Sequence, residues 1–202
     1  MPSELSQELI DSLLRQQAEE FVTNFDTANY LLATTVTSTP EHELLRAGRR
    51  LILSPDAAAR ILGTRLVRDL KELRTQAAAD LADLLRYEQD EDVICWIVSA
   101  FGSLPSESVT DELIALAAHP DPAIRYHAAT ALVNSGDPSP ASFDVLLALC
   151  ADDDAEVRFS AVFELGGWWQ ASHDVRAEAV LRRAIRDSDP FVFRAARDAL
   201  SA

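Results

Sequence analysis

The stretch DPAIRYHAATAL, from Asp121 to Leu132, decides the fold because its pattern recurs along the chain. Each copy begins with an aspartate, has an aliphatic residue three places later and continues with small apolar residues at helical spacing. Two clear copies follow it, DAEVRFSAVFEL at 154–165 and DPFVFRAARDAL at 189–200, and two weaker copies precede it at 56–67 and 90–101. Recurrence of this kind predicts a stack of helical units rather than a globule with one central core.

The period of the pattern is regular. The steps between the aliphatic positions of successive copies are 34, 31, 33 and 35 residues. A period in this range is typical of repeats built from pairs of helices. The aliphatic positions, which should be buried, are Ala59, Val93, Ile124, Val157 and Val192.

The charge of the chain is unevenly distributed. The formal net charge is -15, and the segment between Tyr87 and Val157 holds 14 acidic residues against a single basic one, Arg125. Such a field repels phosphate backbones and attracts basic surfaces. We therefore expect no nucleic-acid ligand and a basic protein partner.

Composition suggests the class of protein. No apolar run reaches the ~18 residues of a membrane span, and the polar, acidic N-terminus does not resemble a signal peptide. We expect a cytoplasmic protein that does not contact a membrane. Cys95 and Cys150 are too few for a disulfide framework or a zinc cluster, and we interpret them as unpaired structural thiols. High alanine content and near-exclusive use of arginine, with Lys71 the only lysine, indicate a bacterial origin.

The chain divides into a terminal cap and a row of repeats. Two helices, at about 3–22 and 27–37, do not fit the repeat, and we interpret residues 1–38 as an N-terminal helical cap. An amphipathic helix that binds a partner is the alternative for this segment. The remaining chain, 39–202, gives about five repeats, at 39–72, 73–104, 105–136, 137–170 and 171–202. Outer helices are expected at 41–53, 75–86, 109–118, 141–150 and 175–186, and inner helices at 56–70, 92–104, 123–135, 155–168 and 191–201.

Capping signals mark where these helices begin and end. A side chain that can accept a hydrogen bond, followed by proline, favours a helix start. Proline is tolerated at the first helical position because the backbone N–H that it lacks would have no partner within the helix there. Glycines that tolerate left-handed backbone favour a stop, and we expect one at Gly136 and one at the Gly166-Gly167 pair. The five expected starts are Thr39-Pro40, Ser54-Pro55, Asp121-Pro122, Ser139-Pro140 and Asp189-Pro190.

In three copies an arginine follows the aspartate by four residues. Arg60, Arg125 and Arg158 stand in the acid-first order that favours an ion pair along one helix. The second copy has Ile94 at this position and the last has Phe193, so any arginine ladder should be interrupted at the former and shifted to Arg194 at the latter.

The repeat closely resembles the HEAT-repeat family, in the D-P-x-V-R-x-x-A-A-x-A-L variant found in phycobilisome-lyase-type proteins. The resemblance covers about 39–202, and the 121–132 copy matches nearly every motif position. It implies an all-α fold, an α-solenoid or α-α superhelix, with inner helices lining a concave face. It also implies that each motif arginine is directed at the neighbouring repeat.

The positions that the motif leaves free predict a binding surface on the concave face. They carry aromatic residues at Trp96, Tyr126, Phe159 and Phe163, which resemble the aromatic anchors of a protein interface. The alternatives are that these rings are core residues and that the nearby acids only cap helices. The expected surface also includes the polar residues Ser99, His127 and Thr130 and an acidic rim of Glu88, Glu91 and Glu107.

The sequence contains no recognisable catalytic constellation. The four histidines have spacings that suit no metal site, and there is neither a nucleophile elbow nor a glycine-rich phosphate loop. We expect a non-enzymatic scaffold or adaptor without cofactor or metal, for instance an inhibitor or immunity protein that neutralises a basic toxin. The alternative, permitted by the resemblance, is a lyase or chaperone subunit that handles a bilin or other tetrapyrrole.

Overall fold

The computed structural model describes residues 7–20, 25–134 and 139–201. The chain forms two compact units, an N-terminal unit, Met1–Pro105, and a C-terminal unit, Ser106–Ala202. The described residues form helices joined by short turns, and none of these helices could span a membrane. The predicted all-α class is confirmed for the described residues. The prediction rested on the helical spacing of the apolar residues in the repeated motif.

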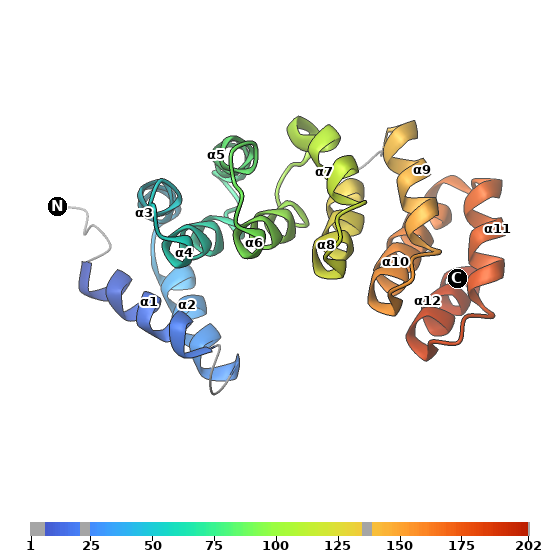
Figure 1. Cartoon of the computed structure of the whole chain (residues 1–202), viewed down its shortest axis with the longest axis horizontal. Coiled ribbons are helices and arrows are strands. Elements are labelled where there is room, and N and C mark those ends of the chain that lie inside the picture. The colour runs from blue at the N-terminus through green and yellow to red at the C-terminus, as the bar shows by residue number, and fades with distance from the viewer. Residues whose placement is uncertain (1–6, 21–24, 135–138, 202) are drawn as a thin grey trace. The chain divides into compact units, whose positions relative to one another are not determined.

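The N-terminal unit contains a helical hairpin followed by two repeats (Figure 1). The hairpin helix α1 packs on α2 and on α4, the inner helix of the first repeat, while α4 also packs on α3 and α6. The helices of this unit are α1 (Gln7–Glu20), α2 (Phe25–Ser38), α3 (Glu41–Ile52), α4 (Ala57–Val67), α5 (Arg74–Leu85) and α6 (Glu91–Phe101).

The C-terminal unit contains three repeats. The inner helix α10 packs between α8 and α12, and the outer helices α7, α9 and α11 each pack on an inner helix of the unit (Figure 1). The elements of this unit are the 3-10 turn η1 (Glu107–Val109), α7 (Thr110–Leu116), α8 (Pro122–Val133), α9 (Pro140–Leu149), α10 (Ala155–Ser172), α11 (Val175–Ala184) and α12 (Pro190–Ser201).

The repeated aliphatic positions form the core, as predicted. All are at most 5% exposed. Burial of a valine or isoleucine side chain stabilises the fold by about 1.5–3 kcal/mol, and burial of the single methyl of Ala59 by less. Small residues such as Ala128 and Ala161 are fully buried beside them, which lets the helices approach closely. The buried key residues are Ala59, Val93, Ile124, Val157 and Val192.

An arginine ladder links successive repeats within each unit. We use this name for three pairs, Arg60–Glu88, Arg125–Asp152 and Arg158–Asp187, in which Nε and Nη2 of the arginine donate to both carboxylate oxygens at 2.6–3.0 Å. The expected pairing with the aspartate four residues earlier is wrong. The third nitrogen, Nη1, instead donates to two carbonyls in the turn before its own helix.

The ladder is absent from the repeat that has Ile94 at the arginine position, as expected. In the next repeat, His119 occupies the position that Glu88, Asp152 and Asp187 hold in the pairs of the ladder. Its Nδ1 accepts a hydrogen bond from the N–H of Asp121 at 3.1 Å. In the last repeat Arg194 has a different role, with its guanidinium 5.9 Å from the ring centroid of Phe191.

The capping prediction is confirmed at three of the five expected starts. Asp121, Ser139 and Asp189 accept backbone N–H groups of the helices that follow them. The other two are shifted, because α3 begins after Pro40 without a side-chain cap and α4 is capped by Asp56 rather than by Ser54.

The expected stop at Gly166-Gly167 is also wrong. Helix α10 continues to Ser172 and ends at His173, whose φ of 54° and ψ of 34° are left-handed. The other expected stop, Gly136, lies outside the described residues.

Candidate functional site

A groove between α10 and α12 is the strongest candidate site in the C-terminal unit. Its volume is about 440 Å³. We call it the phenylalanine groove because Phe159, Phe163 and Phe191 line it. The other lining residues are Glu164, Gly166, Gly167, Gln170, Arg194, Ala195, Asp198 and Ala199.

The three rings form one exposed cluster. Phe163 and Phe191 are each 61% exposed, while Phe159 is half-buried between them. The ring centroid of Phe159 lies 6.2 Å from that of Phe163 and 6.4 Å from that of Phe191, within the range of favourable aromatic pairs. A cluster of large apolar side chains that is left in water is typical of an interaction surface.

Two glycines of α10 give the groove its shape. A Cβ atom on Gly166 would lie 2.7 Å from Cβ of Ala199, so this glycine lets α12 approach α10 closely. A Cβ atom on the next residue, Gly167, would meet nothing within 4 Å. The first glycine therefore brings the two walls together, and the second leaves the space between them open.

Three charged residues line the groove together with the rings: Glu164, Arg194 and Asp198. Burial raises the pKa of Glu164, although a hydrogen bond with Thr130 opposes this shift. Asp198 accepts from Nη2 of Arg197 at 3.0 Å. Together these carboxyl groups place acidic oxygens beside the exposed rings, while Arg194 adds one cation over Phe191.

The predicted residues on α8 lie beside α10 in the same unit. Tyr126 and His127 are half-buried, with ring centroids 5.1 Å apart in an edge-to-face arrangement. Thr130 lies 3.2 Å from the hydroxyl of Ser160, which donates to the carbonyl of Tyr126 at 3.1 Å. These hydroxyls join α8 to α10, so Thr130 has a structural role whether or not a partner binds.

Trp96 and Ser99 belong to the N-terminal unit, on α6. Both are half-buried, and the Trp96 ring is 4.9 Å from the guanidinium carbon of the buried Arg65. Trp96 lines a second cavity, in its own unit. Its membership of the same partner surface as Phe159 stays a prediction.

The predicted acidic rim needs one correction. Glu88 is not a free rim acid, because its side chain is only 5% exposed and both of its oxygens bind Arg60. Burial disfavours its charge, but Arg60 and the N–H groups of Asp90 and Gln89 more than compensate and lower its pKa. Glu91 and Glu107 are exposed, so their role in binding a partner stays a prediction.

Sequence reasoning missed Phe191, which forms one wall of the groove. It occupies the unspecified position after the proline of the motif, where the 121–132 copy has Ala123. A large apolar residue at a position that packing leaves free was the available signal. Phe193, at the motif's arginine position, is also exposed.

Two other features of the described residues concern chemistry. Among the parts of the chain that the structure describes, no cluster of three or more histidine, cysteine, aspartate or glutamate residues could hold a metal ion. Neither Cys95 nor Cys150 forms a disulfide bond, and burial raises the pKa of Cys150 to about 12. A thiol with such a pKa stays protonated at neutral pH and is a poor nucleophile.

Comparison with known proteins supports the fold. Residues 78–166 match a family model described as HEAT repeats. A comparison with curated proteins gives no match. The phycobilisome-lyase subtype therefore stays a prediction.

Several solved structures are similar over nearly the whole chain. An engineered protein shares 17% identity at a TM-score of 0.57, covering 94% of this chain and 95% of its own. A designed armadillo repeat protein shares 14% identity at a TM-score of 0.52, covering 95% and 98%. Another, in complex with the peptide (KR)4, shares 14% identity at a TM-score of 0.56, covering 96% and 99%. At these identities the likeness establishes the fold, and the chain is an α-solenoid whose residues 78–166 resemble HEAT repeats.

Proposed function

We propose that this chain is a non-enzymatic protein-binding module and that the phenylalanine groove receives a basic segment of its partner. The observation that carries the proposal is the pair Phe163 and Phe191, each 61% exposed on either side of a groove. Covering an exposed phenylalanine contributes about 1.5–3 kcal/mol, so the pair can serve as the anchor of an interface.

Charge supports a basic partner. The C-terminal unit carries 16 acidic residues against eight basic ones, and Glu164 and Asp198 stand in the groove itself. The similar armadillo repeat protein in complex with (KR)4 shows that a solenoid of this class can hold a basic peptide, which supports the same chemistry here.

The residues of the groove suggest how such a segment would be held. Lysine and arginine have apolar stems that can lie on the rings of Phe163 and Phe191, while their charged ends reach the carboxylates. The surplus of acid would accelerate the encounter and make it dependent on salt. Binding would need no covalent chemistry from the chain.

The test is calorimetric titration of the intact chain with a peptide of alternating lysine and arginine and with an acidic peptide of equal length. We expect the basic peptide alone to bind, more weakly as salt is raised. The double variant Phe163→Ala/Phe191→Ala should weaken binding by about 2 kcal/mol or more. Gly167→Leu should also weaken it, by filling the groove from a position with open space.

The matched control is Val175→Ala, which shortens an exposed apolar side chain on α11 of the same unit. It should leave binding unchanged. Equal affinity for the two peptides would contradict the basic partner. If the double variant bound the basic peptide as tightly as Val175→Ala does, the groove would not be the binding site.

A further inference from the structure

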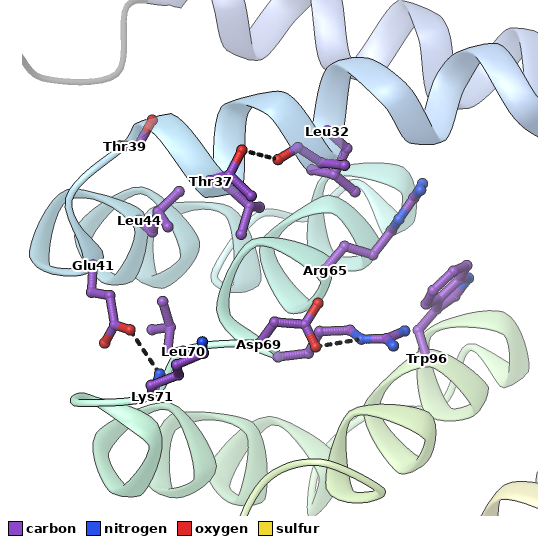
Figure 2. A pocket seen from close by; sticks show the side chains of 13 residues that line it. Leu32, Thr37, Thr39, Glu41, Leu44, Arg65, Asp69, Leu70, Lys71 and Trp96 are labelled. Carbon is purple, nitrogen blue, oxygen red and sulfur yellow. Dashed lines mark hydrogen bonds and ion pairs between the residues drawn. The ribbon is translucent and has the colours of Figure 1, made fainter.

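The N-terminal unit contains a larger cavity that the proposed function does not use. Its volume is about 780 Å³, within the range of about 300–1,000 Å³ that small-molecule sites occupy. Figure 2 shows Leu32 and Thr37 on one side of it and Leu70 and Lys71 on the other, with Trp96 at its edge. Its walls therefore come from α2, α3, α4, α6 and the turn after α4.

Much of the wall is apolar. The described part of α2 contributes aliphatic side chains that face those of α3 and of the turn after α4 (Figure 2). Leu44 and Leu70 are buried behind this surface. The apolar lining residues are Leu32, Ala33, Val36, Leu44, Leu70 and Trp96.

The charged groups of the cavity are mostly cationic. Arg65, Arg68 and Lys71 line it, and Lys71 is the only lysine of the chain. Arg65 is 6% exposed, with its guanidinium carbon 4.9 Å from the centroid of the Trp96 ring. A positive lining is unexpected here, because the N-terminal unit as a whole has 17 acidic residues against ten basic ones.

The two acids of the cavity are engaged by the protein itself. The carboxylate of Glu41 accepts the N–H groups of Lys71, Glu72 and Leu73 at 2.8–3.0 Å. Figure 2 shows the bond to Lys71. The N–H of Lys71 is the main cause of the lowered pKa of Glu41, so this group stays charged and bound to the turn. Asp69 accepts from Nε of Arg68 at 3.4 Å. Asp69 thus partly compensates Arg68, and the lining as a whole holds three cations against two acids.

From this combination we propose that the cavity binds an amphipathic anion, a small molecule with an aliphatic tail and a single carboxylate or phosphate head. The tail would lie against the leucines and Val36, and the head would meet Lys71 and Arg68. Trp96 and Arg65 form one end of the site, where the ring fixes the position of the guanidinium. Apolar walls with a few placed charges are typical of sites for such ligands.

Because Lys71 is the only lysine of the chain, its protection from acylation directly reports binding of a ligand in the cavity. The intact chain would be treated with an amine-acylating reagent, with and without dodecanoate or dodecyl phosphate below their micelle-forming concentrations. Mass spectrometry would report acylation of Lys71, with the N-terminal amine as internal reference. We expect either anion to protect Lys71 about tenfold relative to that reference, and the more effective one identifies the head group.

Comparator ligands and variants decide the outcome. Dodecanol and dodecyltrimethylammonium should protect Lys71 much less than the anions do. In calorimetric titrations, Arg68→Gln/Lys71→Gln should weaken dodecanoate binding about tenfold, whereas Arg86→Gln, an exposed arginine of the same unit, should not. Far-UV circular dichroism of each variant would show that it is folded.

Three results would overturn the proposal. One is the absence of protection by either anion, and another is equal protection by the neutral and cationic comparators. The third is undiminished dodecanoate binding by Ala33→Trp, which places an indole in the cavity from an exposed position on α2.

Discussion

At the scale of single residues, the two neighbouring glycines of α10 differ in what an added side chain would meet. Gly166→Ala would bring its Cβ atom to 2.7 Å from Cβ of Ala199, whereas Gly167→Ala would enter open space. Alanine favours a helix over glycine by about 1 kcal/mol, so the second change should raise the free energy of unfolding by up to that amount. The first should lower it by about 1 kcal/mol net, because overpacking of a close helix contact costs more than the helix gains. Urea unfolding of the two variants checks this, and equal effects would contradict the assigned close approach.

The Arg60–Glu88 pair allows a second comparison of single residues. Glu88→Gln removes the charge of a largely buried acid that binds Arg60 through both oxygens, and should cost about 3 kcal/mol. The control is Asp80→Asn, because the Arg49–Asp80 pair is nearly as short, at 2.7 Å against 2.6 Å, but more exposed. An exposed pair contributes about 0–1 kcal/mol, so this variant should unfold almost as the unchanged chain does. Similar midpoints of urea unfolding for both variants would show that the ladder adds little.

At the scale of the helices, a side-chain cap marks the start of several of them, α10 included. The carboxylate of Asp154 accepts the N–H groups of Glu156 and Val157 at 2.8 and 3.2 Å at the start of α10. Asp154→Ala should therefore lower the free energy of unfolding by about 1 kcal/mol. Asp153, one residue earlier, is exposed, and Asp153→Ala should change it by less than about 0.5 kcal/mol. Thermal unfolding followed by circular dichroism would separate the two, and a larger loss for Asp153→Ala would refute the assignment of the cap.

The length of α10 depends on tertiary contacts more than on its own residues. Gly166 and Gly167 weaken a helix, yet α10 continues through both. Gly166 is buried against α12, and the ring of Trp168 lies 4.2 Å from that of Phe143 on α9. Packing on both sides therefore holds the helical conformation that local preference disfavours, and carries Phe163 and Gly167 into the groove wall.

At the scale of the whole molecule, the acids of the arginine ladder make stability depend on pH. Arg125 and Arg158 lower the pKa of Asp152 and Asp187, while at Glu88 the same effect prevails over burial. A pKa that is lower in the folded than in the unfolded state means that the folded chain binds fewer protons in acid. This stabilisation is complete above the ordinary carboxyl pKa of about 4 and is lost as the pH falls through the lower folded values.

We therefore expect the urea midpoint to be nearly constant from about pH 7 to about pH 5 and to fall steeply below about pH 4. The variant Asp152→Asn/Asp187→Asn should be less stable at neutral pH and should lose less stability between pH 5 and pH 3. The same steep fall in this variant would show that other carboxyl groups cause the acid sensitivity.

The sequence by itself determined the repeated helix pairs, their approximate bounds and the buried aliphatic positions. The helix pairs, their bounds and the buried positions can be predicted because the spacing of apolar residues and the helix caps depend on residues close together in the sequence, within a single repeat. For the motif arginines, helical spacing alone favoured a pair with the local aspartate, and only the family resemblance implied that they are directed at the neighbouring repeat. The structure confirms the second direction, because the carboxylate of the next repeat lies opposite each guanidinium. Likewise, the motif predicted free positions for Phe159 and Phe163, but only the packing of α12 on α10 brought Phe191 beside them. In the N-terminal unit, it is the ion pair with Arg60 of α4 that removes Glu88 from the surface. A groove and a buried ion pair require residues from different repeats to meet, and that meeting is decided by tertiary structure.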